Sequence, residues 1–185
     1  MVKAIILAAG RGSRLKGFFN KPKCLIRLGK SNLTLLERTY NNLKDSGVSK
    51  INIITGYKHR EVYKVLKEKA YYIYFKNYRK TNNLQTLLYA KKLLTSSFVC
   101  LFADIIYEKK IIKKLLKNDN DVCLVIDSSK VLEGTMRVKV KKNKVQFIPV
   151  DSEHFSIWSL INNLKSAVIE KVFITASGGP FNNLP

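Results

Sequence analysis

The segment Val2–Lys23, VKAIILAAGRGSRLKGFFNKPK, decides the fold of this 185-residue chain. Its apolar run Ala4–Ala9 predicts a fully buried β-strand, because the run is too short and ends too abruptly for a helix. Gly10 and Gly12 then let the backbone turn tightly and approach a ligand closely. The N–H groups of such a turn suit phosphate. The basic residues that add positive charge to the segment are Arg11, Arg14, Lys21 and Lys23.

The glycine pattern excludes two common phosphate-binding motifs. Leu15 stands where the third glycine of a dinucleotide fingerprint would be, and no Gly-Lys-Ser/Thr follows at the spacing of a P-loop. Beyond this segment, strands and helices alternate in the predicted order. We expect strands at Lys50–Thr55, Tyr71–Phe75, Ser97–Phe102 and Asp121–Ile126. We expect helices from a cap at Asn32 or Thr34 to Gly47, and over residues 59–67, 84–94 and 108–116. This order predicts a Rossmann-like α/β fold with a mostly parallel sheet, and ligands at the strands' carboxyl ends.

Two motifs in order, LAAGRGSRL (residues 7–15) and KPKCLI (residues 21–26), resemble the signature of nucleotidyltransferases. Members of that family join a nucleoside triphosphate to a sugar phosphate or to phosphocholine. The resemblance covers residues 1 to about 145 and implies catalytic roles for Arg14 and Lys23, with Lys23 neutralising charge during phosphoryl attack. The nucleotide-binding residues that it implies are Leu7, Ala8, Ala9, Gly10, Arg11, Gly12 and Ser13. The alternative interpretation of the glycine-rich segment is a tight turn with a solvated basic loop and no ligand.

Two further positions point to the nucleotide and to a metal. Asn82 and Asn83 offer amide donors and acceptors for a base edge, and the resemblance implies a place near the base; a plain helix cap is the alternative. Asp104 follows the strand Ser97–Phe102, where a carboxylate can share Mg²⁺ with phosphates. The resemblance implies the same metal-binding role, with Ala103 replacing the family's usual glycine. A cap on the helix over residues 108–116 is the alternative for Asp104.

From about residue 145 the sequence resembles a different family. IPVDSEHFSIWSLI (148–161) and VFITASGGPFNNLP (172–185) look like the catalytic domain of 1-deoxy-D-xylulose 5-phosphate reductoisomerase. The resemblance implies that Asp151 and Glu153 bind a divalent metal and that Ser152 and Ser177 contact substrate. Independently, an Asp-x-Glu triplet after an apolar strand puts two carboxylates on one side of the chain.

The two resemblances together predict a chimera. We expect an incomplete nucleotidyltransferase domain over residues 1–145, followed by a short foreign α/β segment, a reductoisomerase fragment, over residues 146–185. Gene fusion, recombination and an assembly error all remain open as its origin. Because the segment lacks the reductoisomerase's nucleotide-binding domain, we do not expect NADPH to bind.

Net charge and composition bear on three further questions: nucleic-acid binding, membrane segments and cellular location. The chain carries 34 Lys+Arg against 13 Asp+Glu, a formal charge of +21, which would suit nucleic acid. The lysines are spread along the chain without a recognition motif, so we expect a generic basic surface that concentrates anionic nucleotides. We expect no signal peptide and no membrane span, since no apolar run approaches about 18 residues. Three distant cysteines, Cys24, Cys100 and Cys123, fit thiols in a reducing cytoplasm.

Three functional hypotheses follow. The favoured one is a Mg²⁺-dependent enzyme that moves a nucleotidyl group from a nucleoside triphosphate, with CTP as first choice, to a phosphorylated small-molecule acceptor. The second is a reductoisomerase fragment that is inactive alone. The third is a nucleic-acid-binding module that acts through charge.

Overall fold

A parallel sheet organises the fold, which a computed structural model describes over residues 2–12, 19–79, 83–120, 122–125 and 172–175. The sheet has six strands in the order β5-β4-β1-β6-β8-β7, and all five pairings between them are parallel. The strands are β1 (Lys3–Ala8), β4 (Lys50–Thr55), β5 (Tyr71–Tyr74), β6 (Phe98–Phe102), β7 (Val122–Val125) and β8 (Val172–Thr175). The predicted parallel α/β architecture is therefore confirmed.

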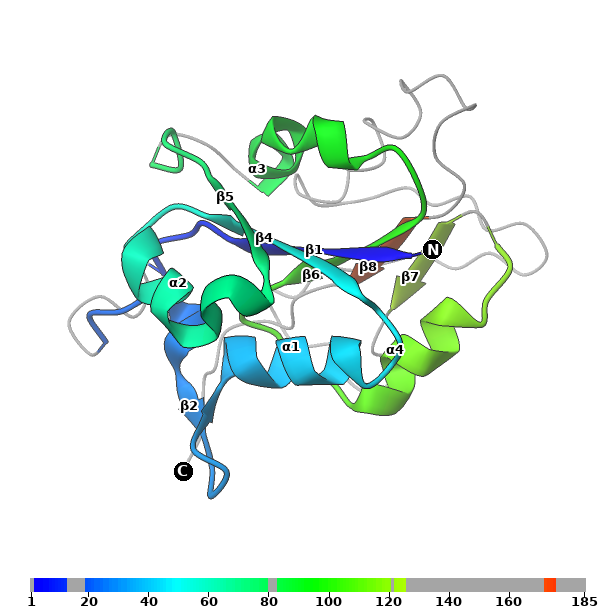
Figure 1. Cartoon of the computed structure of the whole chain (residues 1–185), viewed down its shortest axis with the longest axis horizontal. Coiled ribbons are helices and arrows are strands. Elements are labelled where there is room, and N and C mark those ends of the chain that lie inside the picture. The colour runs from blue at the N-terminus through cyan, green and yellow to red at the C-terminus, as the bar shows by residue number, and fades with distance from the viewer. Residues whose placement is uncertain (1, 13–18, 80–82, 121, 126–171, 176–185) are drawn as a thin grey trace, which may run out of the picture.

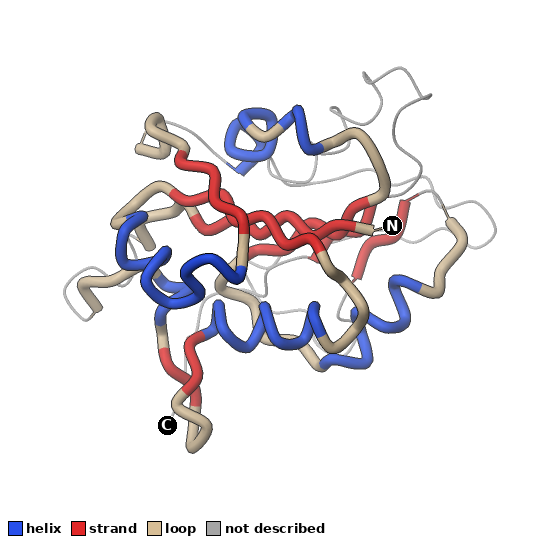
Figure 2. The backbone as a smooth tube through the Cα atoms, in the orientation of Figure 1, coloured by secondary structure: helices blue, strands red, loops and turns tan. Residues whose placement is uncertain are grey.

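Helices cover both faces of this sheet (Figures 1 and 2). On one face lie α1 (Leu35–Lys44), α2 (His59–Leu66) and α4 (Lys109–Leu116), and on the other lies α3 (Asn83–Tyr89). Alternate residues of β1 point to opposite faces of the sheet. Ile6 packs on the face covered by α1, α2 and α4, and Ile5 on the face covered by α3; both are fully buried. The remaining elements are the 3₁₀ turns η2 (Lys23–Leu25), η3 (Lys67–Lys69) and η4 (Lys91–Leu93), and a hairpin of β2 (Arg27–Leu28) and β3 (Leu33–Thr34).

A capping box starts α1 and decides between the two predicted caps. The Thr34 hydroxyl accepts a hydrogen bond from the Glu37 N–H at 3.1 Å, and the Glu37 carboxylate accepts one from the Thr34 N–H at 2.8 Å. Thr34 is therefore the cap, whereas Asn32 lies in the preceding turn with a positive φ of 53°.

The helix predicted over residues 84–94 is shorter than expected, and this prediction was wrong at its end. The α-helix stops at Tyr89, Ala90 leaves the helical region (φ −92°, ψ 19°), and a 3₁₀ turn follows. One carbonyl of that turn has a distant partner, since Lys3 Nζ donates to Leu93 O at 2.8 Å. Apolar spacing continued past Tyr89 because Ala90 and Leu94 are still buried against the sheet.

The strand order reverses at β1. The chain moves from β1 to β4 and β5 on one side, and then returns to β6 on the other side of β1. Such a switch point opens a crevice at the carboxyl ends of the central strands, where open α/β sheets bind ligands. A functional site is therefore expected in the segments that follow β1, β4 and β6.

The strand β8 comes from the far end of the chain but lies inside the sheet. It pairs with β6 from Phe98↔Val172 to Cys100↔Ile174, and with β7 from Val122↔Val172 to Val125↔Thr175. Without β8, β6 would lose its partner on that side and β7 would lose its place in the sheet.

We therefore expect Ile174→Pro to destabilise the whole protein. Proline removes the N–H of a strand that is paired on both sides, and the loss should cost about 3 kcal/mol or more of unfolding free energy. Urea unfolding followed by circular dichroism measures the change. Ile174→Val keeps the N–H and should cost clearly less; equal effects of the two variants would contradict the interior position of β8.

Candidate functional site

The candidate site is built from the segments that leave β1, β4 and β6. The parallel ladder extends past the strands: the Tyr57 N–H donates to Ala9 O at 3.0 Å, and the Ala103 N–H donates to Leu7 O at 3.1 Å. These bonds hold the glycine-rich turn after β1 between the turn after β4 and Asp104. The topology thus brings three separate sequence segments to one edge of the sheet.

Lys23 and Asp104, two predicted functional residues 81 positions apart, meet at this edge. Lys23 Nζ lies 3.5 Å from Asp104 Oδ2, and the two side chains are 30% and 36% exposed. An ion pair this long and this exposed contributes little to stability, of the order of 1 kcal/mol or less. Both charges are therefore accessible to a ligand.

Gly12 packs against the stem of Lys23. Its φ is +64°, and an added Cβ would lie 2.7 Å from Lys23 Cγ, closer than atoms can approach. Glycine is thus required twice here, once for the left-handed backbone and once for the contact. Because Gly12 touches Lys23 and Lys23 touches Asp104, the glycine-rich turn, the lysine and the aspartate form one continuous group.

Asp104 does not cap α4, so the helix-cap alternative is wrong. The N-cap of α4 is Glu108, which makes no side-chain cap hydrogen bond. Within the described residues no group of three or more His, Cys, Asp or Glu side chains could hold a metal ion. Asp104 would thus supply one carboxylate, which fits Mg²⁺, an ion that takes few protein ligands and completes its shell with phosphate oxygens and water.

Cys24, the residue after Lys23, has an unreactive thiol. Burial first, and the negative charge of Asp104 second, raise the pKa of Cys24 to about 12. Burial likewise raises the pKa of Cys100 to about 12. Neither thiol forms a nucleophilic thiolate near neutral pH.

The other predicted site residues divide into three groups. Leu7, Ala8 and Ala9 are buried at the end of β1, whereas Gly10 and Arg11 are exposed at the edge of the sheet. Asn83 is the first residue of α3, which covers the face of the sheet opposite α1, α2 and α4. Ser13, Arg14, Asn82, Asp151, Ser152, Glu153 and Ser177 lie outside the described residues.

Sequence reasoning did not single out Tyr57 and Lys58, which also lie at this edge. Arg11 Cζ lies 5.7 Å from the centroid of the Tyr57 ring, and Lys58 Nζ donates to Asn20 O at 2.5 Å. The signal that could have found them is their position: Gly56-Tyr57-Lys58 directly follows β4, as Gly10 to Gly12 follows β1.

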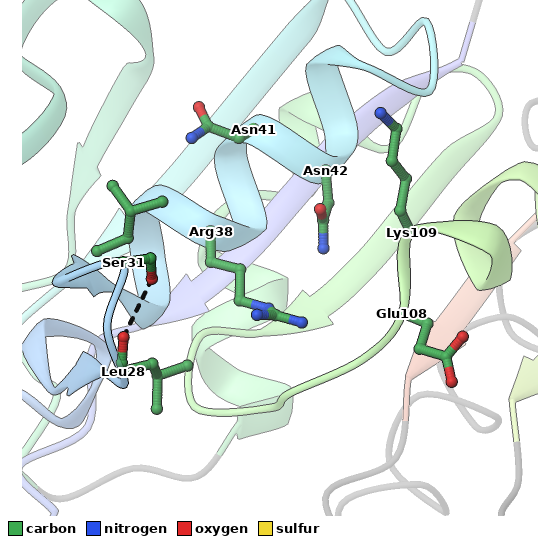
Figure 3. A pocket seen from close by; sticks show the side chains of 8 residues that line it. Leu28, Ser31, Arg38, Asn41, Asn42, Glu108 and Lys109 are labelled. Carbon is green, nitrogen blue, oxygen red and sulfur yellow. Dashed lines mark hydrogen bonds between the residues drawn. The ribbon is translucent and has the colours of Figure 1, made fainter.

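A pocket of about 370 Å³ lies elsewhere, between the β2–β3 hairpin, α1 and the start of α4 (Figure 3). Its polar lining includes Arg38, Asn42 and Lys109, and none of the predicted site residues lines it. Lys109 is engaged outside it by an ion pair with Asp45 at 2.6 Å. The sheet edge, where the predicted residues converge, is the stronger candidate.

Comparison with known families agrees with both resemblances. Residues 4–138 match the family of MobA-like NTP transferase domains. The chain belongs to this family. Residues 147–185, which follow the NTP transferase domain and include β8, match the C-terminal domain of 1-deoxy-D-xylulose 5-phosphate reductoisomerase.

The curated relatives include members of both families. The chain is 29% identical over 137 residues to a CTP:phosphoglutamine cytidylyltransferase of Campylobacter jejuni, covering 69% of this chain and 53% of that protein. It is 67% identical over 45 residues to the reductoisomerase of Pelagibacter ubique, which covers 24% of this chain and 12% of that enzyme. A Clostridium kluyveri reductoisomerase is 30% identical over 169 residues, with 83% and 44% covered. The chain thus spans less than half the length of these reductoisomerases.

Solved structures share the fold of the NTP transferase domain. CTP:phosphocholine cytidylyltransferase from Streptococcus pneumoniae is 37% identical with a TM-score of 0.50, over 56% of this chain and 45% of that one. The inositol-1-phosphate CTP transferase from T. maritima superposes over 97% of this chain and 90% of its own, with a TM-score of 0.69 and 15% identity. No described helix is both long and apolar enough to span a membrane.

Gly12→Ala should destabilise the protein by about 1–2 kcal/mol, because alanine resists a positive φ and its Cβ would displace Lys23. Gly10→Ala is the matched control, since no atom lies within 4 Å of its added Cβ and its φ is not positive. The control should stay within about 0.5 kcal/mol of the wild type. Thermal unfolding of the two variants tests the difference, and equal stability would contradict the contact with Lys23.

Cys24 and Cys100 should resist alkylation by iodoacetamide at pH 8 in the folded protein. Because their pKa values are raised to about 12, the reactive thiolate is scarce at that pH, and burial also blocks the reagent. Both should react once urea unfolds the chain. Peptide mass spectrometry measures the modification, and rapid labelling of Cys24 without denaturant would contradict this environment.

Proposed function

We propose that the chain binds a Mg²⁺–nucleoside triphosphate and transfers its nucleotidyl group to a phosphorylated small alcohol, such as a sugar phosphate or phosphocholine. The observation that carries the proposal is the continuous group of Gly12, Lys23 and Asp104 at the carboxyl ends of β1 and β6. It combines a backbone turn, a cation and a carboxylate where this fold class binds its ligands.

In the proposed reaction an oxygen of the acceptor's phosphate attacks the α-phosphorus of the triphosphate. The new P–O bond forms while the bond from the α-phosphorus to the bridging oxygen breaks, and pyrophosphate leaves with that electron pair. No general base is required, because a phosphate monoester is already ionised near neutral pH. Positioning and electrostatic stabilisation therefore supply the rate.

Each residue of the group has a proposed task. The N–H groups between Gly10 and Gly12 bind phosphate oxygens, and the Lys23 ammonium stabilises the charge that develops on the phosphates. Asp104 holds the metal, and Mg²⁺, when bound, neutralises charge on the phosphate oxygens. Arg14 as a second catalytic cation, Ser13 as a phosphate ligand and Asn82 and Asn83 near the base complete the proposal from the family resemblance.

CTP is the preferred donor in this proposal, because the cytidylyltransferases of C. jejuni and S. pneumoniae are named for CTP. We assign the transferase unit to residues 1–145 and the reductoisomerase-like fragment to residues 146–185. Two buried thiols, Cys24 and Cys100, and a nucleotide substrate fit a cytoplasmic location.

A reductoisomerase fragment is the second candidate, favoured by the 67% identity to the P. ubique enzyme over 45 residues. Its predicted site is Asp151, Ser152, Glu153 and Ser177, and we expect no NADPH to bind. A charge-based binder of nucleic acid is the third candidate, with affinity that should fall steeply with salt.

Lys23→Ala should weaken binding of Mg²⁺–CTP by about tenfold to a hundredfold, as expected for the loss of a charge-assisted contact to phosphate. Asp104→Asn should abolish the dependence of binding on Mg²⁺. Neither variant should change the unfolding free energy by more than about 1 kcal/mol, since their mutual ion pair is long and exposed. Calorimetry with CTP, ATP, GTP and UTP measures binding, and pyrophosphate release with phosphocholine or sugar phosphates measures turnover.

Lys44→Ala is the control for the loss of one positive charge, because Lys44 is exposed in the last turn of α1, away from the site. It should bind CTP as the wild type does. Equal weakening by Lys44→Ala and Lys23→Ala would favour a diffuse charge effect. Binding of polynucleotide but of no triphosphate would favour the third candidate, and binding of NADPH would refute the assignment of residues 146–185 as an inactive fragment.

A further inference from the structure

The pocket between the β2–β3 hairpin, α1 and the start of α4 is a second concave site on this protein (Figure 3). Its volume of about 370 Å³ lies at the lower end of the range for small-molecule sites, roughly 300–1,000 Å³. None of the residues that meet at the sheet edge lines it. Any ligand of this pocket is therefore small and separate from the ligand proposed for the sheet edge.

Arg38 is a cation without a partner at this pocket. Within the described residues its guanidinium makes no hydrogen bond and no ion pair. The other charged residues of the lining are engaged. Lys109 Nζ lies 2.6 Å from Asp45 Oδ2, and Glu108 Oε2 lies 2.6 Å from Lys110 Nζ. Because each of these carboxylates already has a lysine, no ion pair compensates the charge of Arg38.

The helix α1 places an amide beside this guanidinium. Arg38 and Asn42 are four residues apart and so share one side of the helix, and both side chains lie in the space between the hairpin and the start of α4 (Figure 3). The Asn42 side chain makes no hydrogen bond within the part of the chain that the structure describes. The residues that α1 buries are Leu35, Leu36, Thr39 and Leu43. Arg38 and Asn42 do not belong to that buried face, so their polar groups can reach a ligand.

The hairpin gives the pocket an apolar wall. Leu28 and Leu33 pair across the hairpin, and both are half-buried and line the pocket. The Ser31 hydroxyl donates to Leu28 O at 3.0 Å and so closes the turn of the hairpin. Polar donors thus come from α1 and carbon surface from the hairpin, a combination that suits a ligand with an anionic part and an organic part.

We propose that this pocket is a second ligand site, which binds a small phosphate monoester. The Arg38 guanidinium presents a planar fork of N–H groups that can bind phosphate bidentately, and the Asn42 amide adds a further donor. A phosphate offers these donors three oxygens, more than a carboxylate does, so we assign the site to phosphate. Leu28 and Leu33 contact the organic part. The inference does not rest on the proposed function, because no residue of the sheet-edge group takes part in it.

Titration of the full-length ¹⁵N-labelled protein with glycerol 3-phosphate, followed by NMR spectroscopy, tests the proposal. We expect shifts of the Asn42 side-chain amide and of the Arg38 Nε–H, with a dissociation constant of the order of 1 mM. Arg38→Gln should weaken this binding at least about tenfold, because it removes the charged fork. The variant should unfold at the wild-type temperature, since Arg38 is exposed and unpaired within the described residues. Lys23→Ala, at the sheet edge, should leave the binding at this pocket intact.

Arg60→Gln is the matched control, because it removes the same group from an exposed position of α2 that does not line the pocket. It should bind as the wild type does, and equal weakening by the two variants would overturn the proposal in favour of diffuse charge. Equal affinity for acetate would overturn the assignment to phosphate. Shifts confined to the Gly10–Gly12 turn would place the phosphate at the sheet edge alone and overturn the second site. No shift at Asn42 up to about 10 mM would likewise identify Arg38 as an ordinary solvated arginine.

Discussion

The pairing of β1 on both sides is the constraint on which the rest of the structure depends. β1 bonds to β4 over six residue pairs and to β6 over five, so it is enclosed by strands at its edges and by helices on its faces. A strand enclosed in this way must be apolar throughout, as Ala4 to Ala8 are. Because both neighbours are parallel to it, their carboxyl ends meet at one edge, and the polar residues of three chain segments gather there.

The position of β8 gives the C-terminal segment a structural role that its sequence similarity does not suggest. Residues 147–185 match a reductoisomerase domain, yet β8 completes a sheet whose other five strands lie in residues 3–125. The physical requirement for an interior parallel strand is modest, namely a short apolar run rich in β-branched residues, and Val172–Thr175 (VFIT) meets it. A strand of this composition makes few specific demands on its neighbours, so a segment whose sequence matches another family can still pair inside this sheet.

Local sequence signals predicted most of the architecture, and long-range contacts account for what they missed. The strand at β1, the cap at Thr34 and the helix ending at Leu116 follow from periodicity and cap chemistry within a few residues. The motif pattern also indicated Gly12, Lys23 and Asp104. The early end of α3 and the left-handed backbone of Lys58 were not predicted in this way. Both lie beside long-range contacts, from Lys3 to Leu93 O and from Lys58 to Asn20 O, which local patterns do not encode. Interior placement of β8 depends on a crossover that no local pattern encodes.

The electrostatics of the edge favour a ligand over a structural role for its charged residues. Arg11, Lys23 and Lys58 lie at or near the glycine-rich turn, and the nearby carboxylates are Asp104 and Glu61. An excess of positive charge at one place opposes folding through self-repulsion, so stability alone does not account for it. Ion pairs as exposed as Lys23–Asp104 offset that repulsion only weakly. The polyanion of the proposed function would offset this repulsion when bound, and its binding energy would then add to the stability of the folded state.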